Sequence, residues 1–170
     1  MQGMKFAQLW RIRFFLKMKV KAIFYDFDGV MTDNRALLSE SGKEYVFVNR
    51  SDGLAISYFK KLKIYQSIIS TESNPIVSKR AKKLKISVYQ KTDNKLKVIK
   101  EILKRKKIKP SETIFIGNDL NDLEVINFLP QTFCPKDSHP KVLNSNAIVL
   151  SKKGGKGVIM DLYNSIISGS

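Results

Sequence analysis

The stretch Ile23-Phe24-Tyr25-Asp26-Phe27-Asp28-Gly29-Val30-Met31-Thr32-Asp33 decides the fold of this 170-residue chain. The apolar run at 20–25 predicts a buried strand that ends at two carboxylates, after which Gly29 allows a sharp turn. Because alternate residues of an extended chain share a face, Asp26 and Asp28 are expected to point to the same side. Two carboxylates held this close repel each other unless a cation or a shared proton lies between them. The pattern therefore indicates a functional site, and the plain alternative is an acidic surface turn.

The composition is that of one globular domain with anionic partners. With 43% hydrophobic residues, the chain can bury a proper core. Lys and Arg total 31 against 15 acids, which gives a formal net charge of +16 and favours anionic small molecules. The basic residues are spread over most of the expected helices, so we interpret them as solvated faces and expect no nucleic-acid binding. The single cysteine, Cys134, excludes an internal disulfide and fits a reducing, cytoplasmic location.

Residues 1–17 form a basic stretch with several aromatic side chains, which we predict to be an N-terminal extension of a domain at 18–170. Its apolar run is too short for a signal peptide. Two interpretations are open: an amphipathic helix that docks on a neighbour or a membrane surface, or a segment upstream of a natural start at Met18. No stretch has the length of a membrane span, so we expect no stable membrane association.

Strands and helices alternate along the rest of the chain. A hairpin is expected at about 35–49, around Ser41-Gly42-Lys43. Helices are expected to begin near 51, 74 and 93, with a closing helix at 158–167, and strands at 64–70, 86–89, 113–117, 132–134 and 147–150. This order predicts a three-layer α/β sandwich with a mostly parallel central sheet.

Polar residues follow two more of these strands: Ser70 and Thr71 after one, and Asn118, Asp119 and Asp122 after the other. The ends of parallel strands meet at one edge of the sheet, where ligands bind in open α/β folds. The oxygen atoms gathered there suit a hard cation such as Mg²⁺. The ordinary alternative for Ser70 is capping of the next helix.

Two lysines are also candidates. Lys95 lies in the first turn of a helix, where a cation is disfavoured, so its presence needs another reason. Lys156 belongs to the basic, glycine-rich loop 152–157, which either folds over an anionic substrate or is a flexible linker.

Taken in order, these residues resemble the four motifs of the haloacid dehalogenase superfamily of phosphotransferases. The motifs are DFDGVMTD at 26–33, Ser70, Lys95 and GNDLND at 117–122. The resemblance runs from about residue 20 to the C-terminus and is closest to a capless subgroup. That subgroup contains 3-deoxy-D-manno-octulosonate 8-phosphate phosphatase and the phosphatase-like domain associated with acylneuraminate cytidylyltransferases. Supporting stretches are FVNRSDGLAI at 47–56, ISTESNPIVSKRAKKLKI at 69–86 and GGKGV at 154–158.

The resemblance implies a Rossmann-like fold with a small hairpin insertion and no large cap domain. It implies a magnesium-dependent phosphatase that acts on a phosphorylated acidic sugar of the octulosonate or nonulosonate type. Asp26 would be the nucleophile that forms an aspartyl phosphate, and Asp28 the general acid and base. Ser70 and Lys95 would also be catalytic. The resemblance further implies that the metal ligands are Asp26, Asp28, Asn118 and Asp119, and that Asp122 supports these ligands without binding the metal itself. It implies that the substrate is bound by Ser70, Thr71, Lys95 and Lys156.

The chain departs from the family pattern at Asn118, where aspartate is common, so one negative charge is lost at the metal site. Thr71-Glu72 also stands where the octulosonate phosphatases have Gly-Arg, and Met160-Asp161 where they have Arg-Glu.

These departures keep an alternative open: a non-catalytic oligomerisation or regulatory module of the same fold, linked to acidic-sugar activation. A phospho-accepting receiver domain is disfavoured because strand 64–70 has no aspartate at its end. Relatives of this kind form tetramers in which hairpins associate and neighbouring subunits cover the site. The resemblance therefore implies a homotetramer.

Overall fold

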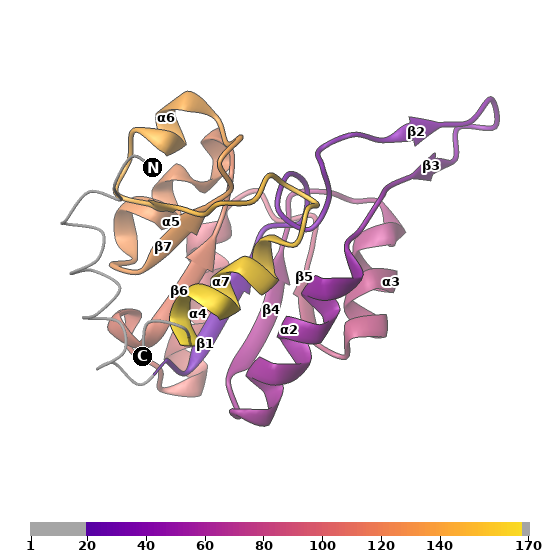
Figure 1. Ribbon diagram of the computed structural model, residues 1–170. Helices are drawn as coiled ribbons and strands as arrows, with labels where there is room; N and C mark the ends of the chain where they lie inside the picture. The colour runs from indigo at the N-terminus through magenta and orange to yellow at the C-terminus, as the bar shows by residue number, and fades with distance from the viewer. Residues whose placement is uncertain (1–19, 168–170) are drawn as a thin grey trace.

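A parallel β-sheet forms the centre of the molecule (Figure 1). The structure is a computed structural model that describes residues 20–167, so the predicted extension at 1–17 lies outside the described residues. Within 20–167 the sheet has six strands in the order β5-β4-β1-β6-β7-β8. Their bounds are β1 Ala22–Tyr25, β4 Tyr65–Ile69, β5 Ser87–Tyr89, β6 Thr113–Ile116, β7 Thr132–Cys134 and β8 Ile148–Val149.

The order of the strands reverses at β1. The chain passes from β1 to β4 and β5 on one side, and then crosses to β6, β7 and β8 on the other. The C-terminal ends of β1, β4 and β6 therefore lie together, at the position where open α/β sheets bind ligands. All four residues of β1 are buried, as expected for an interior strand with a wholly apolar sequence.

Helices cover both faces of the sheet (Figure 1). One core lies between the sheet and α2 Arg50–Lys61, α3 Pro75–Leu84 and α7 Val158–Ile167. The other lies between the sheet and α4 Lys95–Lys106, α5 Leu123–Phe128 and α6 Pro140–Leu143. Short 3-10 helices occur at Pro110–Glu112 and Leu120–Asp122. The predicted three-layer α/β sandwich is confirmed.

The hairpin leaves the body of the molecule between β1 and α2 (Figure 1). Its paired strands are β2 Leu37–Leu38 and β3 Glu44–Tyr45, which are antiparallel and shorter than the arms predicted at 35–49. The turn is closed by hydrogen bonds from Ser39 N to Lys43 O and from Gly42 N to Ser39 O, both 2.9 Å. Large apolar side chains are exposed on this hairpin, with fractions of 65% for Leu37, 64% for Leu38, 48% for Tyr45 and 76% for Phe47.

The hairpin is the small insertion that was predicted, and the part of the chain that the structure describes contains no large cap. Over residues 20–167, none of the helices combines the length and the apolar character that crossing a membrane requires.

Candidate active site

The loop after β1 holds two carboxylates in fixed positions. Asp26 N donates to Ile116 O at 2.9 Å, which continues the pairing of β1 with β6, and Asp26 Oδ1 accepts a hydrogen bond from Phe27 N at 2.7 Å. The backbone then turns at Gly29, whose φ of +77° favours glycine. Thr32 Oγ1 donates to Asp28 Oδ1 at 3.2 Å and thereby orients this second carboxylate.

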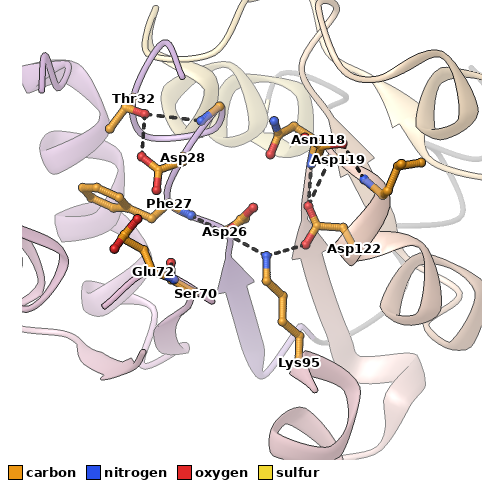
Figure 2. Close-up of polar contacts among 12 residues, drawn as sticks. Asp26, Phe27, Asp28, Thr32, Ser70, Glu72, Lys95, Asn118, Asp119 and Asp122 are labelled. Atoms are coloured by element: carbon orange, nitrogen blue, oxygen red, sulfur yellow. Dashed lines mark hydrogen bonds and ion pairs between the residues drawn. The ribbon is translucent and has the colours of Figure 1, made fainter. Parts of the chain in front are cut away.

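Lys95 forms ion pairs with side chains from the segments that follow β1 and β6. Its Nζ lies 2.8 Å from Asp26 Oδ1 and 2.7 Å from Asp122 Oδ1 (Figure 2). Lys95 is buried at the start of α4, whose N-cap is Asn94, one residue later than predicted. The two carboxylates explain why a lysine occupies an unfavourable place in the first helical turn.

When both carboxylates are ionised, these three buried groups carry two negative charges against one positive charge. Burial is the main cause that raises the pKa of Asp26 to about 8; repulsion from Asp122 adds to this, while Lys95 acts in the opposite direction. Burial alone would lower the pKa of Lys95, but attraction to Asp26 and Asp122 raises it above its ordinary value. The ionised form of Asp26 is therefore disfavoured near neutral pH unless a further cation lies beside it.

Asp122 is a structural centre for the loop after β6. Its Oδ2 accepts hydrogen bonds from Asn118 N at 2.8 Å and from Asp119 N at 3.2 Å, while its Oδ1 faces Lys95. Asp119 caps the following 3-10 helix, since its Oδ1 accepts a hydrogen bond from Leu120 N at 2.7 Å. The role of Asp119 as a metal ligand stays a prediction.

The side-chain amide of Asn118 points toward the first loop (Figure 2). One of its terminal atoms lies 2.8 Å from the Asp28 main-chain O and 3.3 Å from Asp26 Oδ2. If that atom is nitrogen, it donates hydrogen bonds to both oxygens. If it is oxygen, three oxygen atoms converge with no hydrogen between them, which is an arrangement that a cation stabilises.

The residues present fit a divalent metal ion of the magnesium type. The donors would be the Asp26 carboxylate, the Asp28 carbonyl and the Asn118 amide oxygen, all of them oxygen ligands, and a bound cation would favour the ionised form of Asp26. Among the described residues, no three His, Cys, Asp or Glu side chains gather as a metal cluster. This agrees with a donor set in which one ligand is a main-chain carbonyl and another an amide.

Ser70 and Thr71 follow β4, as predicted. Ser70 is buried, and its Oγ accepts a hydrogen bond from Glu72 N at 3.1 Å. Figure 2 shows Ser70 at the strand end beside Asp26. Thr71 is exposed. The roles of Ser70 and Thr71 in binding substrate stay predictions.

The glycine-rich loop 152–157 packs against the first loop. Gly155 N donates to Val30 O at 3.0 Å, and Gly154 N donates to Asp137 Oδ1 at 2.9 Å. A Cβ atom at Gly154 would lie only 2.3 Å from Gly29 O, so this close approach requires glycine. These contacts hold the loop against the domain, so it is not the flexible linker that was one of its two interpretations. Lys156 lies near Asp33, whose pKa is lowered chiefly by Arg35 and to a smaller extent by Lys156.

A cavity of about 250 Å³ opens beside Asp28. Polar groups in its lining include Asp28, Arg35, Glu44, Glu72 and Asn74. Asn74 Nδ2 donates to Glu44 Oε2 at 2.8 Å, which ties strand β3 of the hairpin to the N-cap of α3. Burial raises the pKa of Asp28; the hydrogen bond from Thr32 opposes this, and the charges of Glu72 and Glu44 add to it.

Sequence reasoning missed three of these groups. Thr32 lies inside the first motif and could have been noticed as a polar neighbour of Asp28. Glu72 was noted only as a departure from the family pattern, and its place in the cavity beside Asp28 was missed. Glu44 gave no signal, because its position depends on the direction of the hairpin. Asp52 was missed as well: its Oδ1 accepts hydrogen bonds from Ile159 N at 2.9 Å and Met160 N at 3.2 Å, at the start of α7.

Comparisons with known proteins support the family and the fold. The family of haloacid dehalogenase-like hydrolases matches residues 55–162. The 3-deoxy-D-manno-octulosonate 8-phosphate phosphatase of Yersinia pestis is 28% identical over 149 residues, which cover 87% of this chain and 80% of that protein.

Solved structures show the same fold. A protein of Streptomyces avermitilis, described as a HAD family hydrolase, is 35% identical with a TM-score of 0.84 and covers 88% of this chain and 86% of its own. The 3-deoxy-D-manno-octulosonate 8-phosphate phosphatase of Moraxella catarrhalis, in complex with magnesium, phosphate and KDO, is 25% identical with a TM-score of 0.87. That alignment covers 94% of this chain and 92% of the other.

Proposed function

Since the chain belongs to the haloacid dehalogenase-like hydrolase family, we propose that it is a magnesium-dependent phosphatase acting on a phosphorylated acidic sugar of the octulosonate or nonulosonate type. The family membership agrees with the predicted superfamily and with the prediction of an enzyme of the hydrolase class. One observation carries the proposal: Asp26 is held at the end of β1 with Oδ1 on Lys95 and Oδ2 3.3 Å from an amide atom of Asn118, which also lies 2.8 Å from the Asp28 carbonyl oxygen.

The reaction proceeds in two displacements on Asp26. A carboxylate oxygen of Asp26 attacks phosphorus, the bond from phosphorus to the sugar oxygen breaks, and Asp28 donates a proton to the departing alkoxide. Water then attacks the aspartyl phosphate, Asp28 accepts its proton, and phosphate leaves. The raised pKa of Asp28 suits its role as the acid in the first step.

Lys95 and Ser70 stabilise charge during these steps. Lys95 holds the Asp26 carboxylate and offers its positive charge to the phosphoryl oxygens, and the Ser70 hydroxyl donates a hydrogen bond to one of them. Bound by Asp26, Asp28 and Asn118, with Asp119 as a further candidate, Mg²⁺ would offset charge on the phosphoryl group and favour the ionised form of Asp26.

The sugar portion occupies the cavity beside Asp28. Glu44 and Glu72 accept hydrogen bonds from sugar hydroxyls, and Arg35 is the cation in the lining that suits a substrate carboxylate. Lys156 and Thr71 stand at the edge of the same loops and complete the substrate contacts. The named relatives from Yersinia pestis and Moraxella catarrhalis, which are octulosonate phosphatases, support an acidic sugar.

Exposed apolar side chains on the hairpin support association of subunits. Leu37, Leu38, Tyr45 and Phe47 are uncovered in the single chain, and Glu44 of the same hairpin lines the cavity. A homotetramer that buries these side chains would also enclose the substrate. We place this assembly in the cytoplasm, with no nucleic-acid partner and no stable membrane association.

Phosphate release tests the proposal. Purified protein is assayed with and without Mg²⁺ on a panel of sugar phosphates that includes octulosonate and nonulosonate phosphates, with Asp26→Asn as the control. Metal-dependent release by the unaltered protein alone is expected, and the preferred sugar identifies the substrate. No release from folded, assembled protein would overturn the proposal in favour of the non-catalytic module, which the missing charge at Asn118 favours.

A further inference from the structure

Asn118 holds its amide between two oxygen acceptors at the candidate metal position. The nearer terminal atom lies 2.8 Å from the Asp28 carbonyl and 3.3 Å from Asp26 Oδ2. The residue is only 7% exposed, so water contributes little to satisfying these groups. The nearer contact decides the orientation. An amide oxygen 2.8 Å from the Asp28 carbonyl oxygen is repelled when no cation lies between them, whereas an amide nitrogen in the same place donates a hydrogen bond to that carbonyl. In the absence of a cation, nitrogen therefore faces Asp26 and Asp28.

The backbone of Asn118 is held on both sides. Its N donates to Asp122 Oδ2 at 2.8 Å, and its O accepts a hydrogen bond from His139 N at 2.8 Å. The side chain lies against Gly29, where an added Cβ would be 2.0 Å from an Asn118 amide atom. The side chain therefore has little room to move away. Rotation about the bond between Cβ and Cγ remains available, and it exchanges nitrogen and oxygen at one position.

We propose that Asn118 is a reversible latch on the cation site. Without a divalent cation, its NH₂ group closes the site by bridging the Asp28 carbonyl and Asp26 Oδ2. Cation binding requires the amide to turn over so that Oδ1 faces the same point. The latch rests on the proposed function because it acts at the same site, and it adds a form of control: occupancy follows the concentration of free cation.

An aspartate at position 118 could not act as this latch. A carboxylate has no hydrogen to donate, so in the cation-free protein it would face the Asp28 carbonyl oxygen at close range without a hydrogen bond. The same carboxylate would bind a cation more tightly, because it supplies the missing charge. Compared with aspartate, asparagine at position 118 therefore stabilises the closed state and weakens cation binding.

The experiment compares the unaltered protein with Asn118→Asp, using Asn121→Asp as the matched control. Asn121 is exposed in the same segment, so its substitution adds equal charge without touching the latch. Thermal unfolding is followed in EDTA and in excess Mg²⁺, and Mg²⁺ affinity is measured by titration calorimetry. Compared with the unaltered protein, we expect Asn118→Asp to unfold at a lower temperature in EDTA and to show a larger rise in unfolding temperature when Mg²⁺ is added. We also expect it to bind Mg²⁺ roughly tenfold more tightly. Equal unfolding temperatures in EDTA for all three proteins would overturn the latch.

The side-chain NH₂ signal of Asn118 in ¹⁵N NMR spectra gives a second readout on the unaltered protein. It is assigned by its absence from the spectrum of Asn118→Ala, and it decides the matter even if Asn118→Asp does not fold. We expect slow hydrogen exchange of this group in EDTA and a large shift as Mg²⁺ is added. A signal that does not respond while calorimetry detects Mg²⁺ binding refutes the latch.

The same measurements separate the latch from the phosphatase proposal. Magnesium-dependent phosphate release with an unresponsive Asn118 signal refutes the latch alone. A responsive signal without phosphate release on any sugar phosphate refutes the phosphatase alone.

Discussion

The ammonium group of Lys95 lies 2.8 Å from Oδ1 of Asp26, and the two side chains are only 1% and 7% exposed. Removing one partner of a buried ion pair leaves the other charge without compensation, which costs roughly 3–5 kcal/mol. We therefore expect Lys95→Met to lower the free energy of unfolding by about this amount at neutral pH, as measured by urea denaturation. Lys97→Met, on the exposed side of the same helix, should change it by less than about 0.5 kcal/mol. Equal stability of the two variants would contradict the structural role of the pair.

Asp26→Asn should abolish turnover without unfolding the protein. The amide cannot attack phosphorus, so we expect kcat to fall by roughly 10⁴-fold or more. Stability should be retained, because Lys95 keeps Asp122 as a partner and burial already favours the neutral form of Asp26, which an amide resembles in charge. Initial rates of phosphate release and urea denaturation measure the two effects, with the exposed Asp93→Asn as control. Residual activity above a few per cent would remove Asp26 from the nucleophile's role.

Asp52 should make stability depend on pH in a definite direction. Burial raises its pKa from 3.8 to about 6, against hydrogen bonds from Met160 and Ile159. Between these two values the folded state binds more protons at Asp52 than the unfolded state does. Its contribution to stability is therefore fully present below about pH 4 and is lost as the pH rises through 6.

Asp52→Asn isolates this effect. The two pKa values differ by an amount equivalent to about 3 kcal/mol, which is the upper limit of the change. We expect the unfolding free energy of the variant, relative to the unaltered protein, to rise between pH 4 and pH 7. Urea denaturation at several pH values measures it. A difference that is constant with pH would show that Asp52 titrates normally.

Polar substitutions on the hairpin should dissociate the assembly. The double variant Leu37→Ser, Phe47→Ser removes apolar surface that the single chain leaves uncovered, so we expect sedimentation velocity to detect a monomer. The matched control is Leu54→Ser, Leu62→Ser, at exposed leucines of α2 and its C-cap, which should leave the sedimentation coefficient unchanged. An unchanged coefficient for both variants would exclude the hairpin as the interface.

The edge of the sheet could be predicted from sequence because each strand there is an apolar run that stops at a polar residue. Asp26, Ser70 and Asn118 all follow such runs, and a parallel sheet buried on both faces produces this pattern. Lys95 could be identified because a cation at the start of a helix contradicts local electrostatics. The comparisons and the described fold support the superfamily that these residues indicated.

Other features depend on contacts that local sequence does not encode. Asp52 bonds to Ile159, which lies 107 positions further along the chain, and no periodicity connects the two. Glu44 reaches the cavity because of the direction in which the hairpin leaves the body. Helices α5 and α6 are six and four residues long, too short to show a helical repeat of apolar residues. The orientation of the Asn118 amide is set by oxygen atoms from another loop.

Because a chain is synthesised from its N-terminus, the contacts of Gly154, Gly155 and the start of α7 form late in biosynthesis. The loop that carries Asp26 and Asp28 is translated early. The hydrogen bond from Gly155 N to Val30 O, which supports this loop, can form only after residue 155 has been synthesised. While residue 159 is still inside the ribosome, Asp52 also lacks its hydrogen-bond donors. Asp26 is therefore synthesised long before the residues that complete its surroundings. A product truncated by a stop codon ahead of residue 154 retains every motif from 26 to 122 but lacks this support for the loop.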